Sequence, residues 1–98
     1  MANPFIQIDR PLAATSTAQN IDFGVPCGAY TIYNSDAANG VWCKVNGTPT
    51  YGVANGQFYL APGRGLSIPN TTVTTIGVIC DTGLTATVMA TGIPMEQV

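Results

Sequence analysis

Apolar and polar residues alternate in several segments of this chain with the two-residue period of a β-strand, most clearly at residues 41–45 and 84–91. In residues 41–45 the first, third and fifth residues are apolar and share one face, whereas Trp42 and Lys44 are expected on the other. No stretch repeats its apolar residues with the period of about 3.6 that an amphipathic helix requires. The pattern therefore predicts an all-β fold.

Glycine, proline and asparagine interrupt this alternation at intervals of about ten residues, as in sandwiches and barrels. The segments between the breaks predict short strands at residues 5–8, 20–23, 29–33, 41–45, 57–60, 66–68, 73–80 and 84–91. The last two are expected to form a hairpin through Asp81-Thr82-Gly83. Seven or eight short strands joined by polar turns favour a single antiparallel β-sandwich, with jelly-roll order as one arrangement.

Both ends of the chain differ from the middle. Residues 12–20 are mostly Ala, Thr, Ser, Asn and Gln, which are too polar for a core and indicate a loop or an extended arm. Residues 93–98 are apolar but contain Pro94, and so predict a short tail. The expected division is an N-terminal strand and arm at 1–19, a sandwich at 20–92 and a tail at 93–98. Removing residues 1–11 is then expected to leave the sandwich folded.

Charged residues make up only 8% of the chain, against about 25% in an ordinary soluble domain. The three cations, Arg10, Lys44 and Arg64, are dispersed and the net charge is −2, which argues against direct binding of nucleic acid. No apolar run approaches the roughly 18–20 residues that span a bilayer, so no membrane partner is expected. A large uncharged surface suits a protein that packs against neighbouring proteins.

The N-terminus and the cysteines agree on the compartment. The first four residues contain no cation, and Asp9-Arg10-Pro11 interrupts any apolar stretch. The sequence therefore predicts no secretory signal, and the chain is expected to be synthesised in the cytosol. Cys27, Cys43 and Cys80 are an odd number at wide spacing, and the chain has no histidine. This pattern indicates three buried free thiols rather than a disulfide framework or a zinc site, so no metal or cofactor is expected.

The sequence contains few residues that could catalyse a reaction. Without histidine a general base must be a carboxylate, and the five available carboxylates lie at strand ends, in turns or in the tail. Asp36 and Asp81 have the positions of turn-forming residues that bind the local backbone. Gly63-Arg64-Gly65 lacks the following helix and the lysine of a phosphate-binding loop, so it predicts a turn with an exposed arginine. No catalytic residue is assigned, and the chain is not expected to be an enzyme.

The aromatic residues leave three interpretations open. Trp42 faces away from the apolar side of its strand, and Tyr30, Tyr33, Tyr51 and Tyr59 are expected to point partly outward. They can close the core, anchor a protein interface, or stack on sugar rings. A sugar platform requires the rings to lie coplanar on one exposed face.

Four segments of the chain carry a resemblance to a known group of proteins. They are V-W-C-K-V-N-G at residues 41–47, F-Y-L-A-P-G-R-G-L-S-I at 58–68, the β-branched segment 73–80, and G-L-T-A-T-V-M-A-T-G at 83–92. Together they resemble the small all-β capsid decoration, or cement, proteins of tailed bacteriophages. The resemblance implies a homo-oligomer, usually a trimer, that binds the outer capsid surface at threefold or quasi-threefold positions. There it bridges neighbouring major capsid subunits.

This function predicts particular contact residues and leaves two alternatives. Residues 3–6 can extend a neighbour's sheet by strand addition. The expected interface residues are Pro4, Phe5, Ile6, Ile8, Trp42, Tyr59, Arg64 and Met95. One alternative is a tail or head–tail joining component. The other is a carbohydrate-binding adhesin module that binds a host glycan at the virion surface.

Overall fold

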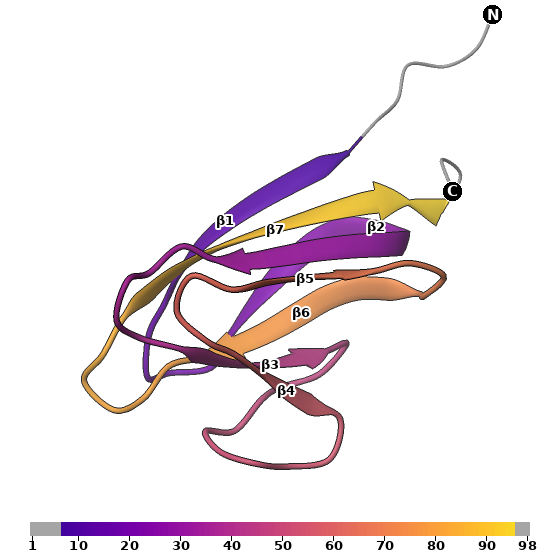
Figure 1. Ribbon diagram of the computed structural model, residues 1–98. Coiled ribbons are helices and arrows are strands. Elements are labelled where there is room, and N and C mark those ends of the chain that lie inside the picture. Colours follow the sequence, from indigo (N-terminus) through magenta and orange to yellow (C-terminus); the bar gives the residue numbers. More distant parts are fainter. Residues whose placement is uncertain (1–6, 96–98) are drawn as a thin grey trace, which may run out of the picture.

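The computed structural model describes residues 7–95, which form seven antiparallel strands without an α-helix (Figure 1). The all-β prediction is confirmed. The strands are β1 (Ile8–Ala14), β2 (Gln19–Asn34), β3 (Val41–Val45), β4 (Gln57–Leu60), β5 (Gly65–Ile68), β6 (Val73–Ile79) and β7 (Ala86–Pro94).

The sixteen-residue strand β2 organises the sheet, because its two parts have different partners. Its first part, from Gln19 to Asp22, pairs with β6. Its second part pairs with β7 on one side and with β5 on the other. The strand order is β1-β7-β2-β6-β3-β4, with β5 beside β2. All seven strands thus belong to one hydrogen-bonded sheet, and a sandwich or jelly-roll arrangement is not confirmed.

The change of partner occurs at Gly24-Val25-Pro26. Gly24 has a φ of 80°, and its N–H donates to Asp22 Oδ1 at 2.8 Å. The register with β6 shifts between Asp22 and Cys27, so this segment bends the strand. The prediction that these residues end one strand before another begins at Ala29 is wrong. A glycine at positive φ allows an irregularity within a strand as well as a turn after it.

We call β1, β7, the second part of β2 and β5 the upper half of the sheet, and the first part of β2, β6, β3 and β4 the lower half. Figure 1 shows the upper half above β6, β3 and β4. Gly92 of β7 lies against Phe23 and Cys27: a Cβ there would be 2.8 Å from Cys27 Sγ and 3.0 Å from a Phe23 ring carbon. The fully buried core side chains come from both halves and include Phe23, Ile32, Val41, Val73, Ile76, Val78 and Val88.

The alternation in β7 is confirmed in part. Ala86, Val88 and Ala90 are buried, and the exposed Met89 lies on the other face. Leu84, which an uninterrupted alternation over the predicted strand 84–91 would place on the same face as Ala86, precedes β7 and is 41% exposed.

The predicted hairpin of the last two strands is wrong. β6 and β7 do not pair with each other, since β2 lies between them in the sheet. Residues 80–85 instead connect the lower half to the upper half. Each strand gains more buried surface against β2 and the core than a two-stranded hairpin provides.

The interpretation of residues 12–20 as a loop or arm is correct for residues 15–18, which connect β1 to β2, and wrong for the residues on either side. Residues 12–14 belong to β1, which pairs with β7 from Ile8 to Ala14. Ala14 is fully buried and Leu12 packs against the core. Ala13 and Ala14 are weakly hydrophobic, so the low hydrophobicity of this segment concealed a strand.

The predicted C-terminal tail includes two residues that belong to β7. Ile93 and Pro94 continue β7, where Ile93 pairs with Ala29 and the buried Pro94 pairs with Cys27.

Candidate interaction surfaces

The outer side of the upper half is a charge-poor surface, which we call face A. Its residues point away from the core and come from all four strands: Asp9, Pro11 and Ala13 of β1, Thr87, Met89 and Thr91 of β7, Ala29, Thr31 and Tyr33 of β2, and Gly65 and Ser67 of β5. Asp9 is the one charged residue among them. The strand register arranges these side chains in rows that cross the sheet.

Two neighbouring rows give face A its relief. One row runs Asp9, Thr91, Thr31, Ser67, and Thr91 Oγ1 donates to Asp9 Oδ1 at 2.8 Å while the Thr31 and Ser67 hydroxyls lie 2.9 Å apart. The next row contains Met89 opposite Tyr33, which are 41% and 45% exposed. The first row is therefore low and hydrogen-bonded, whereas the second projects outward.

A shallow hollow of about 400 Å³ opens beside the projecting row. Its walls are apolar carbon atoms and a few hydroxyl groups. The outward-facing lining residues are Ala29, Thr31, Ser67, Pro69, Thr91 and Ile93. Face A thus presents a ridge and a hollow side by side.

The outer side of the lower half is partly covered by the chain itself. The loop between β3 and β4 folds back so that Gly47 and the buried Pro49 lie directly on Gly77 of β6, where no Cβ would fit. Asn46, at a φ of 54°, holds the start of β6: its Nδ2 donates to Thr72 O at 3.0 Å and its Oδ1 accepts from Thr74 N–H at 2.8 Å. This cover leaves the half-buried Trp42 and the exposed Tyr59 at one end of the lower half.

Trp42 and Tyr59 form this aromatic patch. Their ring centroids are 5.2 Å apart with planes tilted by 53°, and Tyr59 is 50% exposed. The Tyr59 ring lies over Gly40, where a side chain would displace it. The prediction that Trp42 and Cys43 face opposite ways is confirmed, since Cys43 is fully buried.

Trp42 and Tyr59 are not coplanar, and two further tyrosines lie away from them. Tyr30 is buried, with 5% of its surface exposed, and Tyr33 lies on face A in the other half. Tyr51 is 53% exposed, and its pKa is raised by desolvation and then by the negative charge of Asp81. Trp42 and Tyr59 therefore lack the coplanar geometry expected of a sugar platform.

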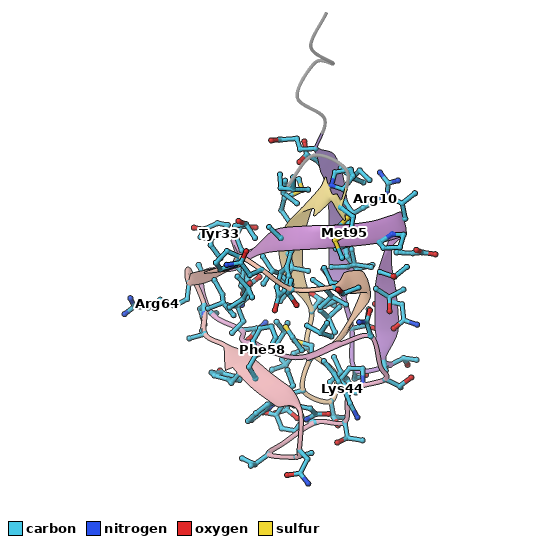
Figure 2. All side chains as sticks on the ribbon, turned by 90° about the vertical axis from the view of Figure 1, so that its right-hand side faces the viewer. Arg10, Tyr33, Lys44, Phe58, Arg64 and Met95 are labelled. Atoms are coloured by element: carbon cyan, nitrogen blue, oxygen red, sulfur yellow. The ribbon has the colours of Figure 1, made fainter. Side chains whose placement is uncertain are left out.

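The remaining predicted interface residues are scattered. Pro4, Phe5 and Ile6 lie outside the described residues. Ile8 is half-buried and packs against the core at the start of β1. Arg64 is exposed in the turn between β4 and β5, and Figure 2 shows it projecting into solvent apart from Met95, which is 45% exposed after β7. Within residues 7–95, the structure brings only Trp42 and Tyr59 together among the predicted set.

The acidic turn residues behave as predicted. Asp36 Oδ2 accepts from the N–H groups of Ala38 and Asn39 at 2.9 and 2.7 Å, which lowers the pKa of this carboxyl. Asp81 Oδ1 accepts from Thr82 N–H at 2.7 Å. These carboxylates are used to form turns.

The three cysteines are free and buried, as predicted. Burial raises the pKa of Cys43 to about 12, and it also raises the pKa values of Cys27 and Cys80. The thiolate is the reactive form of cysteine, so all three groups are poor nucleophiles near neutral pH. In the part of the chain that the structure describes, no three potential ligands come together to hold a metal ion.

The sequence pattern does not identify Asn34 as a residue that connects several segments of the backbone. Asn34, which is fully buried, donates from Nδ2 to the carbonyl oxygens of Asn39 and Leu60 at 2.9 and 3.2 Å, and its Oδ1 accepts from Asp36 N–H at 3.0 Å. The sequence indicated a turn here, but an alternation of exposed and buried positions says nothing about such distant partners.

Comparison with known proteins does not assign a function to these surfaces. No family model matches the chain, and no curated protein is significantly similar to it. Among residues 7–95, no helix is long and apolar enough to cross a membrane.

Proposed function

We propose that this chain is a structural protein of a virion, which attaches to the outer capsid surface as a homo-oligomer and joins neighbouring major capsid subunits. It is made in the host cytosol and acts on the assembled particle. The proposal combines the resemblance to phage decoration proteins with one structural observation. That observation is the bare face A, a four-stranded surface whose one charged side chain, Asp9, is bonded to Thr91.

The physical argument concerns the cost of removing a surface from water. Burying unpaired charges is expensive, whereas burying methyl, methylene and hydrogen-bonded hydroxyl groups is favourable or nearly neutral. Face A therefore suits burial against another protein. A joining protein also needs a second contact surface, and the Trp42–Tyr59 patch supplies one on the other half of the sheet. Tryptophan and tyrosine are enriched at the energetic centres of protein interfaces.

Repetition gives such contacts their strength. Each surface of a 98-residue chain is small, but an oligomer presents several copies of it to a lattice at once. After the first contact forms, the others form at a high effective concentration. Weak contacts then hold the protein on the shell.

The test is binding to capsid particles that lack the protein. Purified chain is incubated with undecorated particles of its source virus, and bound protein is measured by co-sedimentation and located by cryo-electron microscopy. We expect density on the outer shell and a higher melting temperature of the decorated particles. Trp42→Ala is expected to reduce binding at least tenfold, whereas Thr82→Ala, an exposed turn substitution, leaves it unchanged.

Other outcomes identify the two alternatives. Density at the tail or the neck, with none on the shell, replaces the decoration role with a joining role. If the chain binds no part of the particle and Trp42→Ala instead abolishes binding to a glycan array, the adhesin alternative is correct. The 53° tilt between the Trp42 and Tyr59 rings is the observation against that alternative.

A further inference from the structure

We infer that face A is the surface on which two copies of this chain meet, with the sheets packed face to face about a two-fold axis. The inference deepens the homo-oligomer part of the proposed function by naming its surface and its partner. It departs from the trimer that the resemblance implies, because it rests on the shape of face A.

Face A is the sheet surface that the described chain leaves bare. The outer side of the lower half has its own cover, in which Gly77 permits Gly47 and Pro49 to lie on the sheet. No such loop covers the rows of face A within residues 7–95, where Tyr33 and Met89 remain 45% and 41% exposed. An uncovered β-sheet with apolar side chains is commonly buried against a second sheet, at a spacing of about 10 Å.

The charge of face A favours a second copy over a charged partner. Asp9 is the one acidic or basic residue of face A. It lies in the edge strand β1 and accepts hydrogen bonds from Thr91 Oγ1 and from Gln7 Nε2 at 2.8 and 3.2 Å. Two such faces can approach without opposing large like charges. A basic partner would find one carboxylate here, and an acidic partner would find no cation on face A.

The relief of face A is complementary to itself. Met89 and Tyr33 form a ridge, and the hollow of about 400 Å³ adjoins the next row, at Thr91 and Thr31. In a two-fold arrangement each residue pair is repeated, so the ridge of one copy enters the hollow of the other twice. A cyclic trimer instead requires two different patches that face different neighbours. One ridge beside one hollow on a single face therefore fits a dimer.

The size of the face sets the expected strength. Four strands at about 4.8 Å spacing give a width of about 15 Å, and the nine residues of β7 give a length of about 30 Å. The resulting area of about 450 Å² is below the roughly 800 Å² per partner of a standard interface. Dimerisation is therefore expected to depend on concentration.

Sedimentation equilibrium over a wide concentration range tests the inference on the full chain. We expect the mass to rise from 10.2 kDa to twice that value. Met89→Lys places a charge on the ridge and is expected to weaken dimerisation at least tenfold. The matched control is Thr82→Lys, in an exposed turn outside face A. Circular dichroism confirms that each variant is folded.

Cross-linking provides a readout that does not depend on weakening the dimer. Thr31→Cys places a thiol between the ridge and the hollow, near the expected axis, while the three native thiols are buried. Mild oxidation is expected to give a covalent dimer with Thr31→Cys and not with Thr82→Cys. A monomer at every concentration, a trimer, or a dimer that Met89→Lys does not weaken would overturn the inference.

The same variants separate this inference from the proposed function. If Met89→Lys is monomeric and the wild type still binds undecorated particles, both proposals stand. If the wild type dimerises through face A but binds no particle, only the capsid role fails. If it binds particles and remains monomeric in solution, only the dimer fails.

Discussion

At the scale of single residues, the buried amide of Asn34 connects segments that are distant in sequence. Its side chain bonds to the backbone of Asp36, Asn39 and Leu60, and its own N–H donates to Arg64 O at 2.9 Å. These contacts hold the end of β2 against the turn between β4 and β5. A buried polar group that loses its partner costs about 1–3 kcal/mol.

Asn34→Ala is therefore expected to lower the free energy of unfolding by at least about 2 kcal/mol, because it leaves three carbonyl groups and one N–H without this partner. Urea denaturation measures the loss. Asn55→Ala, in an exposed loop, is the control and is expected to change stability by less than about 0.5 kcal/mol. Equal losses in the two variants would show that Asn34 has no special structural role.

Cys43 predicts a pH dependence of stability. Its pKa rises from an ordinary value of 9.0 to about 12 on folding, because burial penalises the thiolate. Between these values the unfolded chain loses a proton that the folded chain retains. The contribution of this group is therefore fully present below pH 9 and is lost as the pH rises toward 12.

The measurement compares the free energy of unfolding at about pH 8 and about pH 10.5 in the wild type and in Cys43→Ala. The variant is less stable at both pH values because it leaves a cavity. We expect its loss of stability with rising pH to be smaller than that of the wild type. An identical loss would mean that the thiol does not titrate as its burial requires.

At the scale of elements, β1 belongs to the folded sheet. It pairs with β7 from Ile8 to Ala14, and Arg10 Nε donates across to Asp22 O at 3.1 Å, at the bend of β2. Pro11 is compatible with this position because β1 is an edge strand.

Deleting residues 1–11 is therefore expected to lower the melting temperature by at least about 8 °C, which corresponds to about 2 kcal/mol in a domain of this size. The deletion removes half of β1 and uncovers part of β7. A deletion of residues 1–6 leaves every described contact in place and serves as the control. If both truncated chains have the melting temperature of the wild type, the pairing of β1 contributes nothing to stability.

At the scale of the whole molecule, β2 couples the two halves of the sheet. Its first part completes the lower half and its second part lies at the centre of the upper half. Phe23 and Cys27, on either side of the bend, both contact the position of Gly92. Neither half keeps its core if β2 leaves the sheet.

The chain is therefore expected to unfold in one cooperative transition. Fluorescence of Trp42, the single tryptophan, reports on the lower half, while far-ultraviolet circular dichroism reports on all strands. The two signals should have the same midpoint in urea. An earlier transition of Trp42 would show that the lower half opens independently.

The strands predicted best are those with clear turn residues on both sides in the sequence. Residues 41–45 and 57–60 were predicted with the bounds of β3 and β4, and 73–80 differs from β6 by one residue. The outward position of Trp42 follows from the two-residue period of its strand. Prediction failed at β1, where small residues such as Ala14 hid the core face, and at Gly24, where a bend resembled a turn.

The amino-acid sequence by itself determined the all-β class, the small charge and the burial of the three cysteines, because these depend on composition and on neighbouring residues. Only the tertiary structure decided which strands pair. It placed β2 between β6 and β7 and thereby assembled face A from four separate segments. Alternation fixes the side of a strand to which a residue points. The partner of that strand depends on how much surface the whole chain can bury, which no local pattern contains.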